Sequence, residues 1–137
     1  MLTYLAAYAI ALVLFVALDI IWLMTMGASL YRATLGDILL PTVKIAPAIV
    51  FYLMFPIGII VFAVAPALRA GSPLPALLYG ALFGLLAYAT YDLTNHATLK
   101  NWTLKITAID IVYGAVVVGA VSTLTFYVLH WFGRSAG

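Results

Sequence analysis

Residues 2–26 read LTYLAAYAIALVLFVALDIIWLMTM, and this stretch decides the fold class. It carries one charged side chain, Asp19, and its apolar residues do not alternate with polar ones. A helix needs about 20 mainly apolar residues to cross the roughly 30 Å hydrocarbon core of a bilayer, whereas the strands of a membrane barrel alternate. The stretch therefore predicts a membrane-spanning helix.

Three more stretches of this kind follow, at residues 47–67, 75–95 and 106–132. Together with residues 2–26 they predict an all-α integral membrane protein, a four-transmembrane-helix antiparallel bundle. The segments between them are too short for a separate soluble domain, so residues 1–137 are expected to form a single domain.

The connections between these stretches contain helix breakers and polar residues. The longest joins Met26 to Lys44, and its residues Tyr31–Asp37 are expected to lie at the membrane interface, outside the helices. Pro66–Pro75 predicts a turn, and Pro56 predicts a kink in the second helix. His96–Lys105 predicts a short polar connection between the third and fourth helices.

The composition excludes several classes of protein. Of 137 residues, 67% are hydrophobic and 7% are charged, whereas an average soluble domain has about 25% charged residues. Soluble and disordered chains are thereby excluded, and a net charge of +2 is too small and scattered for nucleic-acid binding. The absence of cysteine excludes disulfides, thiol nucleophiles and cysteine-ligated metals.

The basic residues divide unequally between the two ends of the predicted bundle. Arg69 and Arg134 belong to the end that holds both termini. The other end has Arg32, Lys44, Lys100 and Lys105. Because cytoplasmic segments carry the excess of Lys and Arg, this second end is expected to be cytoplasmic and the termini periplasmic.

Three of the four acidic residues lie inside the predicted helices. Antiparallel threading places Asp19, Asp92 and Asp110 at similar depth near the cytoplasmic end. A charged side chain near the centre of a membrane helix costs about 2.5–3.5 kcal/mol, and less toward the interface. We therefore expect all three to face the bundle interior and to approach one another.

The third helix carries the richest polar face. Tyr88, Asp92 and Asn95 lie at i, i+4 and i+7, and His96 lies four residues after Asp92. If the cluster is catalytic, Asp92 is the acid–base candidate, tuned by Asp19 and Asp110, with His96 sharing protons.

A wider set of polar and aromatic side chains near the same end is expected to bind a ligand. These candidates are Trp22, Tyr52, Tyr88, Tyr91, Asn95, Lys44, Lys105 and Tyr113. There is a structural alternative, in which such groups only hydrogen-bond neighbouring helices and set their register. Trp22, Trp102 and Trp131 could also be anchors of the interfacial aromatic belt, and Asp92 could form an ion pair with Lys100 or Lys105.

No cofactor is evident from the sequence. The chain has no Glu, so the Glu-x-x-His pattern of di-iron bundles is absent, and His96 and His130 belong to opposite interfaces. The three aspartates with Asn95 and His96 could hold a hard divalent cation such as Mg²⁺ or Mn²⁺. The metal, if any, stays open.

Gly80 and Gly84 form a Gly-x-x-x-Gly pattern on the third helix. This spacing lets membrane helices approach closely, and it would allow a homo-oligomer to form through this face.

Several motifs resemble one bacterial membrane family, catalogued as domain of unknown function 2177. They are Asp19–Trp22, Phe51–Tyr52, Phe62–Leu68, Tyr88–Asn95, Ala97–Trp102 and Asp110–Gly114. The resemblance covers essentially the whole chain, with Tyr113 where the family is expected to have Trp. It implies the bacterial inner membrane and no established activity.

Three kinds of function remain open on these observations. The first is binding or modification of a lipid or similar amphiphile, because the chain places polarity at headgroup depth and apolar helices beyond it. The second is a proton- or cation-coupled transporter that works as an oligomer, which would need polar residues in both leaflets. The third is a purely structural membrane subunit. Whether the protein is an enzyme is left open.

Overall fold

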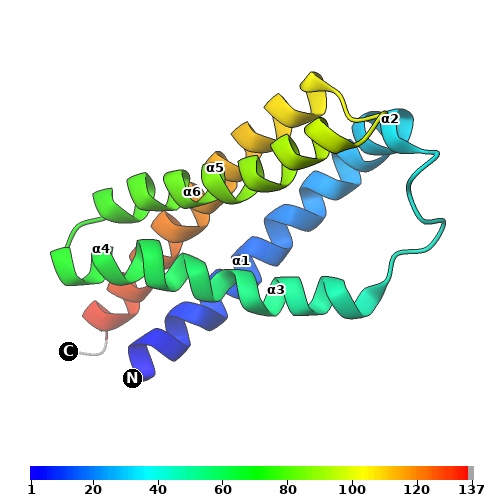
Figure 1. Ribbon diagram of the computed structural model, residues 1–137. Helices are drawn as coiled ribbons and strands as arrows, with labels where there is room; N and C mark the ends of the chain where they lie inside the picture. Colours follow the sequence, from blue (N-terminus) through cyan, green and yellow to red (C-terminus); the bar gives the residue numbers. More distant parts are fainter. Residues whose placement is uncertain (136–137) are drawn as a thin grey trace.

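The structure is a computed structural model that describes residues 1–135, with side chains through Gly133, and its described part is all-α (Figure 1). Its elements are α1 (Leu2–Met26), η1 (Gly27–Arg32), α2 (Ala33–Leu35), α3 (Ile45–Ile59), η2 (Ile60–Val64), α4 (Ala65–Ala70), α5 (Leu74–Thr98) and α6 (Leu104–Ser135). The two η elements are wider, π-helical turns. They run on directly from α1 and α3, so the eight elements make four continuous rods.

These four rods are long and apolar enough to cross a membrane, which confirms the predicted fold class. They comprise residues Leu2–Leu35, Ile45–Ala70, Leu74–Thr98 and Leu104–Gly133. Each extends beyond its predicted range, because backbone hydrogen bonding continues past the polar residues at which the apolar runs end. His96 accordingly lies in α5, and only residues 99–103 connect α5 to α6.

The first rod extends further than the sequence predicted. Tyr31–Leu35 was expected outside the helices, but it belongs to η1 and α2, and the connection to α3 is residues 36–44. Leu30 and Leu35 are buried here against Trp102 and Ile106 near the start of α6. This apolar contact holds the extended end of the first rod inside the bundle.

The second rod contains the other π-helical segment, and Pro66 explains its position. Proline has no N–H and its ring clashes with the carbonyl four residues earlier. Just before it, the Ala65 N–H donates to the Ile60 carbonyl, a bond that spans five residues and widens the turn. The rod ends at Gly71, whose φ of 61° suits a residue without Cβ.

Glycine allows α5 and α6 to form the closest pair of helices. A Cβ at Gly80 would overlap Ser122, and one at Gly84 would overlap the Gly114 carbonyl. The close approach that this Gly-x-x-x-Gly spacing allows is therefore made within the chain, against α6, and a homo-oligomer through Gly80 and Gly84 stays a prediction.

The apolar core lies toward the end that holds the N-terminus, where all four rods meet. Phe15, Ile59, Val64 and Val118 are fully buried there. Toward the other end, α3 keeps its contact with α1, and it contacts α5 through Phe55, whose ring stacks on Phe83; most of the contact between the second rod and α5 is made by η2 and α4. Figure 1 shows α3 leading away from α5 and α6 toward the connection with α2. A cavity lies at this end.

Candidate functional site

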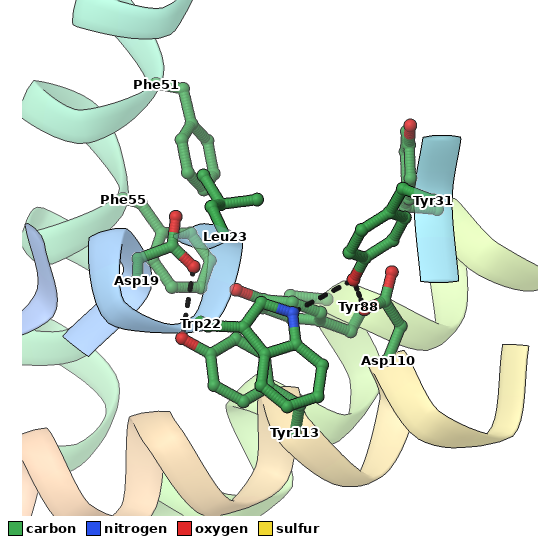
Figure 2. A pocket seen from close by; sticks show the side chains of 11 residues that line it. Asp19, Trp22, Leu23, Tyr31, Phe51, Phe55, Tyr88, Asp110 and Tyr113 are labelled. Atoms are coloured by element: carbon green, nitrogen blue, oxygen red, sulfur yellow. Dashed lines mark hydrogen bonds between the residues drawn. The ribbon is translucent and has the colours of Figure 1, made fainter. Parts of the chain in front are cut away.

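A cavity of about 440 Å³ lies among α1, η1, α3, α5 and α6 (Figure 2). Its lining is mostly apolar and rich in aromatic rings. The lining residues are Asp19, Trp22, Leu23, Tyr31, Phe51, Phe55, Ala87, Tyr88, Tyr91, Asp110 and Tyr113. All four rods contribute, so the cavity exists only in the assembled bundle.

Asp19 on α1 forms one polar wall of the cavity and is 8% exposed. Its carboxyl oxygens accept hydrogen bonds from the hydroxyl of Tyr52 at 2.5 Å and from that of Tyr113 at 3.1 Å. The donors come from α3 and α6, so Asp19 joins three rods. Two donors on one buried carboxyl group satisfy it without a basic side chain.

Asp110 on α6 forms a second polar wall and is 5% exposed. It accepts a hydrogen bond from the hydroxyl of Tyr31, and that hydroxyl accepts one at 3.0 Å from Trp22 Nε1. Tyr31 lies in η1, so the π-helical turn places this phenol in the bundle. Such turns are frequent at functional sites.

An aromatic stack separates the two carboxyl groups. The rings of Trp22 and Tyr113 lie parallel, with centroids 4.0 Å apart and 9° between their planes. Figure 2 shows Asp19 on one side of this stack and Asp110 on the other. The ring of Tyr88 is seated against Gly114, where a Cβ would overlap it.

Asp92 on α5 is fully buried and does not line the cavity. Neither of its carboxyl oxygens has a hydrogen-bond partner. Its polar neighbour is the carboxyl group of Asp110. Lys100 and Lys105 are exposed, so burial keeps Asp92 away from the ion pair considered for it.

The three aspartates therefore all face the interior, and the charge of Asp19 acts on Asp110 although the aromatic stack lies between them. Asp92 and Asp110 are neighbours, and Asp19 stands across the aromatic stack. Among the described residues, no group of three or more His, Asp or Glu side chains is placed to hold a metal ion.

A family model described as "Predicted membrane protein (DUF2177)" matches residues 4–127. The chain belongs to this family. The matched range includes every residue that lines the cavity. No curated protein and no solved structure matches the chain.

The DUF2177 motifs quoted from the sequence supply much of the lining. Asp19 and Trp22 come from the first, Tyr88 and Tyr91 from the helix-α5 motif, and Asp110 with Tyr113 from the α6 motif. Of the other predicted ligand residues, Tyr52 contacts the site through Asp19, whereas Lys44, Asn95 and Lys105 are not in the lining.

His96 is not joined to the aspartates. It is exposed at the end of α5, and its Nδ1 lies 3.3 Å from the hydroxyl of Thr107. The same hydroxyl accepts a hydrogen bond from Trp102 Nε1 at 3.1 Å. Asp92 and His96 both face α6, but His96 meets Thr107 near the start of that helix whereas Asp92 meets Asp110.

Two of the three tryptophans considered for the aromatic belt pack inside the bundle. Trp22 is half-buried in the cavity wall, and Trp102 is buried against Leu35 and Ile106. Both donate hydrogen bonds to groups of the bundle, Trp22 to Tyr31 and Trp102 to Thr107. Trp131 is exposed near the end of α6, as a belt residue would be.

Sequence analysis missed the role of Tyr31 and the apolar walls Leu23, Phe55 and Ala87. A uniform helix advances about 2.5 turns over nine residues, which places Tyr31 opposite Trp22. Because η1 is a wider turn, the direction of Tyr31 around the helix axis differs from that of a uniform helix, and its hydroxyl meets Trp22. Nothing in the sequence marked the apolar wall residues as cavity residues, since leucine and phenylalanine are also common on lipid-facing surfaces.

Proposed function

We propose that the protein binds a membrane amphiphile with the polar head in the cavity and the apolar tail directed into the bilayer. The observation that carries this proposal is the cavity itself: it places two buried carboxyl groups and several phenols at one end of an otherwise apolar membrane bundle. Pockets of this size and mixed lining are typical of small-molecule sites.

The borders of the cavity support entry from the lipid. Leu23, Phe51 and Tyr91 line it and are also exposed. All three lie within membrane-spanning rods, so their exposed surface faces hydrocarbon or the headgroup region. An amphiphile could slide its head inward past these side chains without taking its tail out of the membrane.

The one-ended distribution of charge favours binding over transport. Toward the N-terminal end, the interior holds Phe15, Ile59 and Val118, and its polar groups are the hydroxyls of Ser122 and Thr125. Ser122 donates to the Val118 carbonyl of its own helix. A path for protons or cations would need polar groups continuing into this half.

The cavity supports binding more directly than catalysis. Asp92, the acid–base candidate, does not line the cavity. Of the neighbouring pair Asp92 and Asp110, a bound molecule would contact only Asp110. Under this proposal Asp92 acts on the ligand only through Asp110.

The proposed location is the bacterial inner membrane, with the cavity end on the cytoplasmic side. Arg32, Lys44, Lys100 and Lys105 lie at this end, against Arg69 and Arg134 at the other. The excess of basic residues marks the cytoplasmic side. The headgroup would then come from the inner leaflet.

Retention of lipid by variants with a filled cavity tests the proposal. Ala87→Trp places a ring in the cavity, and Leu86→Trp, one residue earlier on an exposed position, is its matched control. Native mass spectrometry of protein extracted in mild detergent should show a lipid adduct on wild type and Leu86→Trp but not on Ala87→Trp. Leu23→Trp at the border provides a second, less crowded substitution. Equal adducts on all four proteins would contradict the proposal.

A further inference from the structure

We infer that the head of the bound amphiphile is an organic cation, an ammonium group carried by a lipid-like molecule. This inference rests on the proposed amphiphile binding and names the ligand class of that site. Three observations support it: the arrangement of the rings, the charge of the lining, and the environment of Asp92.

Aromatic rings meet at steep angles around the cavity. The planes of Phe55 and Tyr88 are 74° apart with centroids 6.4 Å apart, and those of Tyr88 and Tyr113 are 77° apart at 5.9 Å. Rings that meet at steep angles form adjoining walls of a box. Such boxes recognise quaternary ammonium groups, because each ring face is electronegative and attracts a cation within about 6 Å.

The charged groups of the lining are all acidic. Asp19 and Asp110 line the cavity, and no Lys, Arg or His stands among the lining residues. The groups that donate to these carboxyls are the phenols of Tyr31, Tyr52 and Tyr113, which satisfy hydrogen bonds but bring no positive charge. A cationic head is complementary to this lining, whereas a sulfate or phosphate head would meet carboxyl groups without a basic partner.

Asp92 adds an independent observation. Its side chain is fully buried, neither oxygen accepts a hydrogen bond from an N–H group or a hydroxyl, and its carboxyl group lies within hydrogen-bonding reach of that of Asp110. Buried carboxyl groups in such a pair need a compensating cation or a shared proton. A cation bound at Asp110 would compensate the pair from the cavity side. A shared proton would do the same without a ligand, and the experiment separates the two.

The test compares amphiphiles with the same twelve-carbon tail and different heads. The purified full chain in a neutral maltoside detergent is titrated with dodecyltrimethylammonium, dodecylamine at pH 7, dodecyl sulfate, and the uncharged dodecyl dimethylphosphine oxide. Binding is measured as bound amphiphile per protein by native mass spectrometry. Both cationic probes should bind about tenfold or more tightly than the sulfate and the uncharged probe. Tighter binding of the trimethylammonium probe than of the primary amine would indicate an aromatic box, and the reverse order would indicate a simple ion pair.

Variants assign the binding to the cavity. Asp19→Asn and Asp110→Asn should each weaken binding of the cationic probes about tenfold. Asp37→Asn is the matched control, because Asp37 is the remaining acidic residue and is exposed in the connection. Tyr91→Leu, at an exposed border position, should weaken binding of the trimethylammonium probe more than binding of the uncharged one; it removes the ring contact with Trp102, and leucine keeps an apolar side chain there.

Each outcome is decisive. Equal binding of cationic and uncharged probes would overturn the inference in favour of a shared proton and leave amphiphile binding in place. No binding of any probe, with no lipid adduct on the wild type, would remove both proposals. Cationic binding that Asp37→Asn weakens as much as Asp19→Asn would show general attraction to acidic residues and would also overturn the inference.

Discussion

The three intramembrane carboxyl groups differ in the partners that the bundle provides. Asp19 has two phenolic donors, Asp110 has one, and Asp92 has none. Residue type is the same for all three, so the difference arises from which helices face each side chain. The chemical role of one of these aspartates therefore cannot be inferred from that of another by their positions in the sequence.

The substitution Asp92→Asn tests the cost of the unpartnered carboxyl group. An asparagine amide at this position could donate to Asp110, so that a contact between two carboxyl groups would become an ordinary hydrogen bond. We expect the variant to be more stable than wild type by about 0.5–1.5 kcal/mol. The measurement is reversible unfolding in mixed micelles. Asp19→Asn, which disturbs two existing bonds, is the contrasting variant and should lose stability. A loss of more than about 1 kcal/mol in Asp92→Asn would show that the carboxylate itself stabilises the fold.

At the scale of the elements, glycines on α5 and α6 set the distance between the helices that carry Asp92 and Asp110. Gly84 and Gly114 lie where the backbones approach, and Gly114 also makes room for Tyr88. The same closeness buries Asp92. The site therefore depends on residues that contribute no functional group.

Gly84→Ala should destabilise the protein, whereas Gly27→Ala should not. A Cβ at Gly84 would overlap backbone atoms of Gly114, and forced overpacking costs about 1–3 kcal/mol. A Cβ at Gly27 meets nothing within 4 Å, so this substitution is the matched control. Unfolding in mixed micelles gives both values. Equal stabilities for the two variants would mean that α5 and α6 are further apart than described.

Both π-helical turns act at this scale too, and they have different origins. η2 ends two residues before Pro66, whose missing N–H explains it. No proline lies near η1, but Tyr31 and Leu30 within it reach Asp110 and Trp102, so tertiary contacts accompany the wider turn.

At the scale of the whole molecule, the asymmetry between the two ends is the main feature. One end joins the rods through an apolar core, and the other opens into a cavity with aromatic and acidic walls. Figure 1 places the start of α1 and the end of α6 away from α2 and from the α5–α6 connection. Orientation in the membrane therefore determines which leaflet can supply a ligand.

Single cysteines determine that orientation cleanly, because the chain has none of its own. Asn101→Cys lies in the α5–α6 connection, and Ser72→Cys lies in the turn between α4 and α5 at the other end. We expect a membrane-impermeant maleimide added to intact cells to label Ser72→Cys and not Asn101→Cys. The distribution of basic residues is the reason. The reverse labelling pattern would place the cavity on the periplasmic side.

Hydropathy alone determined the fold class and the number of membrane-spanning helices. A bilayer core has no water to satisfy backbone groups, so long apolar runs have to form helices, and their length follows from the thickness of the membrane. The same solvent makes a lipid-facing carboxylate costly, which is why the sequence was sufficient to predict that Asp19, Asp92 and Asp110 face inward. All three are buried.

The partners of these three carboxyl groups follow from the packing of the four rods. Tyr31 reaches Asp110 because η1 departs from the period of 3.6 residues on which sequence reasoning relies. Trp22 enters the cavity wall because Tyr113 of α6 faces it, and Gly84 packs within the chain because Gly114 lies opposite. These are contacts between residues far apart along the chain. A hydropathy pattern specifies which face of a helix avoids lipid, but the helix that this face meets, and at what distance, depends on packing among all four rods.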